Sequence, residues 1–160
     1  MSIYIQHAKR RNSVLEENRR RKEKAKIMRK TVIMMDDVVK CREMEGNKFQ
    51  VLIPTVKSKQ ELFSELADKL HFPDYFGYNW GALCEVLRDF YWVNEKIIMI
   101  EHHGISTIPV ADLETYLEII SEVEKFWEED KSHEVLFLFS STDMKIIERF
   151  RISQNACQYL

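Results

Sequence analysis

The chain has 160 residues, of which 45% are hydrophobic and 31% are charged, with only 4 Gly and 3 Pro. Such a composition is typical of one globular domain with a sizeable core, and it excludes collagen-like and low-complexity chains. No apolar run approaches the ~20 residues of a transmembrane helix, and the charged N-terminus does not resemble a signal peptide, so we expect a cytoplasmic protein without membrane contact.

The net charge of −2 hides an asymmetry along the chain. Residues 1–30 carry 11 Lys and Arg against 3 Asp and Glu, which leaves 13 against 23 for residues 31–160. We expect a basic extension over residues 1–30, helical or disordered, followed by an acidic domain suited to a basic partner. Residues 9–30 are able to make weak phosphate contacts with nucleic acid, but they contain no aromatic ring that would stack on bases.

The domain begins with a linker or an extra strand over residues 31–48, where apolar residues surround two aspartates. Residues 49–53 form an apolar run that predicts a strand ended by Pro54. Ser58 and Glu61 then have the S-x-x-E spacing of a capping box, so a helix should follow. The apolar stripe of that helix consists of Leu62, Phe63, Leu66 and Leu70.

An aromatic loop separates this helix from the next one. Pro73 and Gly77 both disfavour helix within residues 71–78, and Asn79 is a suitable N-cap. Apolar positions then recur at helical spacing through residues 80–91, and we expect them to be buried: Trp80, Leu83, Leu87, Phe90 and Tyr91. The opposite, solvent-exposed face of the helix should carry Gly81, Glu85, Arg88 and Asp89.

Two further apolar runs, residues 96–100 and 135–139, predict buried strands. Residues 112–130 between them have helical periodicity with an acidic exposed side, formed by Glu114, Glu118, Glu122, Glu124, Glu128, Glu129 and Asp130. Residues 141–160 form a C-terminal extension in which a short helix would bury Met144 and Ile147. Strands that alternate with helices predict an α/β fold with a small three-stranded parallel sheet.

No pattern in the chain predicts catalysis. Glu101, His102 and His103 form the most enzyme-like cluster, but adjacent strand residues point to opposite sides, so we expect a strand-end role and keep a metal enzyme as the weaker alternative. The motifs of nucleotide-binding and nucleophilic enzymes are absent from the sequence. The three cysteines have no CxxC spacing, which favours reduced thiols over a disulfide or a zinc site. We therefore expect neither an enzyme nor a cofactor.

Residues 70–87 read LHFPDYFGYNWGALCEVL and closely resemble the hallmark of the barstar family, P-[DE]-Y-[YF]-G-x-N-[LW]-D-A-L-x-D-x-L. The order of the expected elements extends this resemblance over residues 49–140. The resemblance implies a barstar-like domain and an intracellular inhibitor of immunity or antitoxin type. Such an inhibitor binds a basic ribonuclease or a related toxin and blocks its active site with carboxylates that take the place of RNA phosphates.

The resemblance also implies a partner-binding surface on the aromatic loop and the second helix. The residues expected there are Tyr75, Phe76, Gly77, Asn79, Gly81, Cys84, Glu85 and Asp89. Gly81 and Glu85 both stand where the family has interface aspartates, and Cys84 stands where its best-known member has a tryptophan. Glu85 and Asp89 are spaced as a carboxylate pair near the helix end, so we expect a cognate toxin other than barnase.

The composition of the aromatic loop alone is equally consistent with rings that pack inside the domain. A different class of function is also open, in which the basic arm binds RNA or DNA and the acidic domain docks another protein. Such a nucleic-acid-associated regulator is the alternative to the inhibitor.

Overall fold

A computed structural model of the chain describes residues 14–16, 19, 32–34 and 46–157, with side chains described for residues 14–16, 19 and 46–149. Contacts within the chain define two units, Met1–Lys30 and Thr31–Leu160. In the first unit, residues 14–16 and 19 are helical and exposed, and the rest of the expected basic extension lies outside the described residues. No helix in the described part of the chain is long and apolar enough to cross a membrane.

The second unit is built on a parallel sheet, to which the described residues contribute four strands in the order β1-β4-β3-β2. The strands are β1 (Val32–Met34), β2 (Lys48–Ile53), β3 (Ile97–His102) and β4 (Glu134–Phe139). Strands β2, β3 and β4 confirm the predicted α/β fold with its parallel sheet. The short strand β1 pairs with the free edge of β4 and lies within the segment expected to be a linker or an extra strand.

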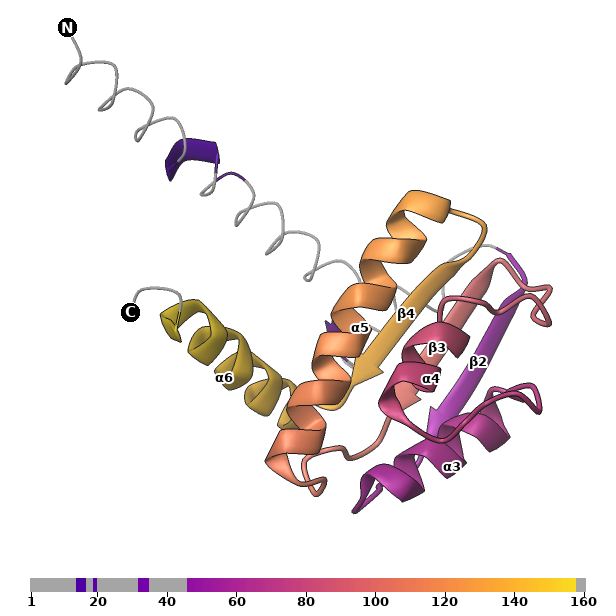
Figure 1. The fold of residues 1–160 in the computed structure, drawn as a ribbon, viewed down its shortest axis with the longest axis horizontal. Coiled ribbons are helices and arrows are strands. Elements are labelled where there is room, and N and C mark those ends of the chain that lie inside the picture. The colour runs from indigo at the N-terminus through magenta and orange to yellow at the C-terminus, as the bar shows by residue number, and fades with distance from the viewer. Residues whose placement is uncertain (1–13, 17–18, 20–31, 35–45, 158–160) are drawn as a thin grey trace, which may run out of the picture. The chain divides into compact units, whose positions relative to one another are not determined.

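Helices α3 (Lys59–Lys69), α4 (Trp80–Val86) and α5 (Val110–Asp130) lie in front of the sheet in Figure 1. Each connection between parallel strands must return across the sheet, and helices are the usual means. The core lies between these helices and the strands. Its fully buried side chains include Ile53, Leu62, Leu66, Leu83, Ile98, Ile100, Tyr116, Phe137 and Phe139.

Helix α3 begins with the predicted capping box. The hydroxyl oxygen of Ser58 accepts a hydrogen bond from the amide of Glu61 at 3.2 Å, and the Glu61 carboxylate accepts one from the amide of Lys57 at 2.7 Å. The first bond satisfies an amide that the first helical turn leaves without a partner, and the second ties the residue before the N-cap to the helix. The predicted stripe from Leu62 to Leu70 is buried, which confirms the orientation of the helix.

Helix α4 is shorter than the predicted helix of residues 80–91. The amides of Arg88 and Asp89 donate to the carbonyls of Glu85 and Val86 at 3.1 and 3.2 Å, which are bonds of a tighter turn than an α-helix. Asp89 therefore lies in a turn beyond the helix. The expectation that Glu85 and Asp89 share one helix face is wrong.

The burial of Phe90 explains why the helix stops. Phe90 has a positive φ of 43° and is fully buried, with its ring centroid 6.2 Å from that of Trp127. Because the chain turns inwards at Phe90, Tyr91 faces solvent with an exposed fraction of 68%. The prediction that Tyr91 is buried is therefore wrong, although Phe90 is buried as expected.

The acidic side of α5 is exposed as predicted at most positions, but Glu124 is only 2% exposed. Glu124 lies four residues after Ile120 and three before Trp127, and both of those side chains are buried. At 3.6 residues per turn these spacings place Glu124 on the apolar side. Its assignment to the exposed side is therefore wrong.

Helix α6 (Ser141–Cys157) has 17 residues and is longer than the short helix expected after β4. Met144 and Ile147 are buried as predicted and belong to the main core. The buried Asp143 carboxylate accepts hydrogen bonds from the amides of Ile105 and Ser106, which connects α6 to the loop after β3.

Candidate partner-binding surface

The aromatic loop is held in place by a turn and a helix cap. The amide of Phe76 donates to the carbonyl of Pro73 at 3.0 Å. Asn79 caps α4, because its Oδ1 accepts from the amide of Ala82 at 2.9 Å and its Nδ2 donates to the Gly77 carbonyl at 3.2 Å. Both ends of the Asn79 amide are therefore engaged, and this residue shapes the loop.

The two glycines of the predicted surface lie close to this cap. A Cβ atom at Gly77 would approach the Asn79 Nδ2 to 3.1 Å, so a side chain there would disturb the cap. A Cβ atom at Gly81 would lie 3.3 Å from the Asn79 Oδ1, which a small shift relieves. The structure therefore explains the need for glycine at position 77 better than at position 81.

Ring packing divides the loop into a buried and an exposed part. Phe76 is buried, with edge-to-face contacts to Phe63 and Phe72 at centroid distances of 6.1 and 4.9 Å. Tyr75 and Tyr78 on either side are 55% and 59% exposed. The buried ring anchors the loop, and the two tyrosines offer large, rigid contact areas to a partner.

Tyr75 is joined to the turn after α4. Its hydroxyl group donates a hydrogen bond to the Asp89 Oδ2, although the two residues are 14 positions apart. Partial removal from water, this hydrogen bond and the nearby negative charges of Asp89 and Glu85 raise the pKa of Tyr75 above its usual range. Tyr75, Glu85 and Asp89 are all exposed, so the structure brings a ring and two carboxylates together on one surface.

Cys84 faces the core side of α4 and contacts α5. Its Sγ donates a hydrogen bond to the Glu122 Oε2 at 3.4 Å, and burial together with this bond raises the pKa of the thiol. The thiol is therefore protonated at neutral pH and is a poor nucleophile. The Arg88 Nε donates to the Cys84 carbonyl at 3.1 Å, which holds the guanidinium against the helix.

Glu122 adds an exposed carboxylate beside α4 that the sequence analysis did not include in the surface. In the sequence it is one of seven acidic residues expected on the exposed side of a long helix. Only the packing of α5 against α4 distinguishes it from the others.

The histidine cluster has a structural role in the described part of the chain. His102 is fully buried at the end of β3, and its ring stacks on Phe139 at 4.5 Å. The Leu138 carbonyl can only accept, so the Nδ1 of His102 donates to it at 3.2 Å, and the Nε2 accepts from the Tyr116 hydroxyl at 2.7 Å. His103 instead points to the other side, with its Nε2 3.7 Å from the buried Glu101. The described residues contain no group of His, Cys, Asp and Glu that is suited to hold a metal ion.

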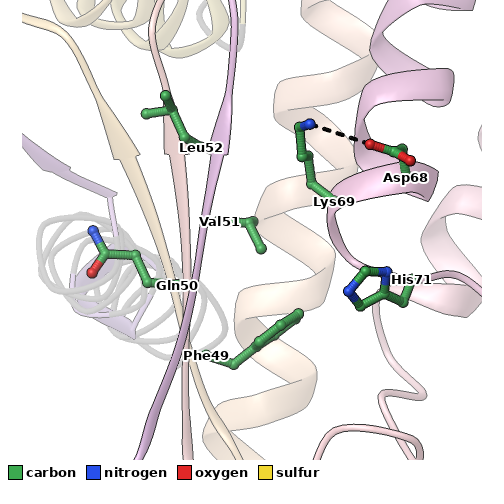
Figure 2. A pocket seen from close by; sticks show the side chains of 7 residues that line it. All are labelled: Phe49, Gln50, Val51, Leu52, Asp68, Lys69 and His71. Carbon is green, nitrogen blue, oxygen red and sulfur yellow. Dashed lines mark hydrogen bonds and ion pairs between the residues drawn. The ribbon is translucent and has the colours of Figure 1, made fainter.

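An open pocket of about 490 Å³ lies between β2 and the end of α3. Figure 2 shows Phe49 and Val51 pointing towards α3, whereas Gln50 and Leu52 point away from it. Lys69 and Asp68 at the rim form an ion pair at 3.2 Å. None of the residues predicted to bind a partner lines this pocket.

Comparison with known proteins identifies the domain. A family model described as "Barstar (barnase inhibitor)" matches residues 46–139, which is more than half of the chain and includes β2 through β4. No curated protein matches the sequence. The matched family consists of inhibitors rather than enzymes, and its model spans the aromatic loop, α4 and α5. The chain belongs to the barstar family.

Proposed function

We propose that this protein binds a ribonuclease or a related nuclease toxin inside the producing cell and blocks its active site with α4 and the aromatic loop. The observation that carries this proposal is the surface formed by Tyr75, Glu85 and Asp89. It combines an exposed ring with two exposed carboxylates, and it lies within the segment that matches the family of barnase inhibitors.

The chemistry of RNA cleavage supports such a mode of inhibition. An enzyme that holds RNA phosphates presents Arg, Lys and His side chains, and these donate equally well to carboxylates through charge-assisted hydrogen bonds. A rigid tyrosine beside the carboxylates supplies contact area at a small cost in conformational entropy. The acidic charge of residues 31–160 favours encounter with a basic enzyme.

The partner we propose differs from barnase in where its cations lie. Gly81 supplies no carboxylate at the start of α4, and Glu85 carries its carboxylate one methylene further from the backbone than aspartate. Asp89 and Glu122 add charge beyond the end of α4 and from α5. A matching enzyme would therefore present its cations opposite the C-terminal end of α4.

The test is an inhibition titration with the purified full-length chain. RNA cleavage is measured for barnase and for each ribonuclease that the immobilised chain retains from secreted proteins. We expect one retained ribonuclease to lose its activity at a one-to-one ratio, in competition with RNA, and barnase to be inhibited less strongly. The proposal fails if every retained enzyme cleaves RNA at its full rate when saturated with the chain.

Surface variants locate the binding site. Glu85→Gln and Asp89→Asn should each weaken inhibition, because each removes one carboxylate from the proposed surface. Glu148→Gln removes the same charge from an exposed position on α6, outside the family match, and should leave inhibition unchanged. If the full-length chain is instead retained on RNA and no ribonuclease is inhibited, the nucleic-acid regulator is the better assignment.

A further inference from the structure

We infer that Asp89 is a positioning residue that accepts the hydrogen bond of the Tyr75 hydroxyl group, so that Tyr75 can only accept hydrogen bonds from a partner. This inference rests on the proposed function and concerns the same surface. It names the chemistry required of the partner group opposite Tyr75. That group must be a hydrogen-bond donor, such as a guanidinium, an ammonium or a backbone N–H.

The backbone fixes both members of the pair. The residue after Tyr75 is Phe76, whose buried ring anchors the loop against Phe63 and Phe72. The residue after Asp89 is Phe90, which is fully buried at the turn that ends α4. Each exposed side chain therefore stands beside a buried aromatic residue, and the hydrogen bond between Tyr75 and Asp89 connects two anchored segments.

The hydrogen-bond inventory then determines what the surface offers. A phenol has one proton, and in Tyr75 that proton is donated to the Asp89 Oδ2. What remains are the lone pairs of the phenol oxygen and the other oxygen of the carboxylate, all of which are acceptors. A partner acceptor placed opposite Tyr75 would meet no proton and would be repelled by the carboxylate, whereas a cationic donor would be bound by both groups.

Neighbouring charges act in the same direction. Partial removal from water is the largest cause that keeps the pKa of Tyr75 above the usual range, and Asp89, Tyr91 and Glu85 also disfavour its ionisation, so the phenol retains the proton that it donates. Arg88, the cation of the same turn, donates its Nε to the Cys84 carbonyl. The structure thus provides Asp89 as a specific acceptor for Tyr75 and not simply as one more negative charge.

The first experiment needs no partner. Ionisation of Tyr75 is followed in the full-length protein by tyrosinate absorbance, as the difference between the wild type and Tyr75→Phe. We expect Tyr75 to ionise well above the pH of an ordinary tyrosine in the wild type and at clearly lower pH in Asp89→Asn. Glu85→Gln is the matched control, because it removes the same charge while the charged acceptor of the Tyr75 hydrogen bond stays in place, and it should lower the titration midpoint less. Equal shifts in the two variants would overturn the inference.

The second experiment is a double-mutant cycle with the ribonuclease that the chain silences most strongly, with barnase as reference. Asp89→Asn should weaken binding about tenfold in the wild type and much less in Tyr75→Phe, because the positioning role needs the hydroxyl group. Glu85→Gln should weaken binding equally in both backgrounds. If Asp89→Asn also has equal effects in both backgrounds, Asp89 acts only through its charge and the inference is wrong.

The two experiments separate the possible failures. If the chain does not bind barnase and retains no ribonuclease, the proposed function fails, and with it the assignment of a hydrogen-bond donor in the partner. The tyrosinate titration still decides whether Asp89 holds Tyr75. If that titration shows no specific effect of Asp89→Asn, the inference fails even when a ribonuclease is inhibited.

Discussion

Gly81 is one of the positions at which this surface departs from the family pattern, because it lacks the carboxylate of the aspartate expected there. The position lies in the first turn of α4, where an added Cβ would approach only the Asn79 Oδ1, at 3.3 Å. Aspartate near a helix N-terminus interacts favourably with the helix dipole and replaces the more flexible glycine. The site should therefore accept an aspartate without loss of stability.

We expect the double variant Gly81→Asp/Glu85→Asp to bind barnase at least about tenfold more tightly than the wild type, because it adds the carboxylate missing at position 81 and shortens the one at position 85 to the aspartate of the family pattern. Calorimetric titration measures the affinity. Gly81→Ala is the control, since it adds the Cβ without the charge and should leave the affinity unchanged. Equal affinities of the double variant and the wild type would show that other residues exclude barnase.

A second residue-scale effect concerns the buried imidazole. Burial lowers the pKa of His102 from 6.5 to about 4. As the pH falls below 6.5, the unfolded chain takes up a proton that the folded protein does not bind until about pH 4. Since stability falls with pH wherever the unfolded state binds more protons, His102 should lower the free energy of unfolding by about 3 kcal/mol between pH 6.5 and 4.

Urea denaturation at several pH values checks this expectation against His102→Gln, which cannot titrate. The wild type should lose stability relative to the variant as the pH falls from 6.5 to 4, while carboxylates common to both cancel. A difference that stays constant over this range would contradict the expectation. If the variant does not fold, an NMR titration of the His102 ring in the wild type decides, with a midpoint expected below pH 5.

At the scale of elements, α6 is joined to the domain by one buried carboxylate. The Asp143 Oδ1 accepts from the amides of Ile105 and Ser106 at 3.3 and 3.2 Å, and its Oδ2 accepts from the Ser140 hydroxyl at 2.9 Å. Without the carboxylate, a buried amide in the loop after β3 loses its partner. Helix α6 lies outside the family match, yet its first turn completes a loop that lies inside it.

We expect Asp143→Ala to lower the free energy of unfolding by about 2 kcal/mol, because it leaves the amides of Ile105 and Ser106 and the Ser140 hydroxyl group without their acceptor. Asp143→Asn retains one acceptor oxygen and should lose less. Urea denaturation of the full-length variants measures both effects. An unchanged midpoint for Asp143→Ala would show that water replaces the carboxylate and that α6 is only loosely joined.

At the scale of the whole molecule, charge is divided between a basic N-terminal unit and an acidic remainder. The sequence places a net charge of +8 in residues 1–30 and −10 in residues 31–160. Association with a basic enzyme is accelerated by opposite net charge, and salt screens this acceleration. The basic unit therefore opposes the attraction that the domain exerts on a ribonuclease.

We expect removal of residues 1–30 to speed association with the silenced ribonuclease at low salt. The association rate should then fall more steeply between about 50 and 500 mM salt than it does for the full-length chain. Stopped-flow fluorescence measures the association rate. Dissociation should change little, because the proposed surface lies in residues 75–122. Identical rates for the two forms at every salt concentration would show that the basic unit does not influence encounter.

Much of the fold follows from local patterns in the sequence. The capping box, the Asn79 cap and the apolar strands depend on residues close to one another in the chain, and the structure confirms them. The aromatic hallmark indicated the family for the same reason, because its residues are contiguous. The strand β1 was expected only as an alternative to a linker, and the length of α6 was not predicted, since pairing with β4 and docking on a distant loop leave no periodic signal nearby.

The surface could be predicted only in part. Tyr75, Glu85 and Asp89 are close in the sequence, and this is enough to place them near one another. Apolar periodicity, however, predicted that α4 extends to Tyr91. Burial of Phe90 against Trp127 ends the helix earlier. That long-range contact exposes Tyr91 and carries Asp89 to the Tyr75 hydroxyl. Packing of α5 likewise selects Glu122 for the surface and buries Glu124. Local sequence thus determines which residues cap helices and fill strands, and contacts between distant segments decide which side chains meet, because those contacts depend on tertiary packing rather than on spacing along the chain.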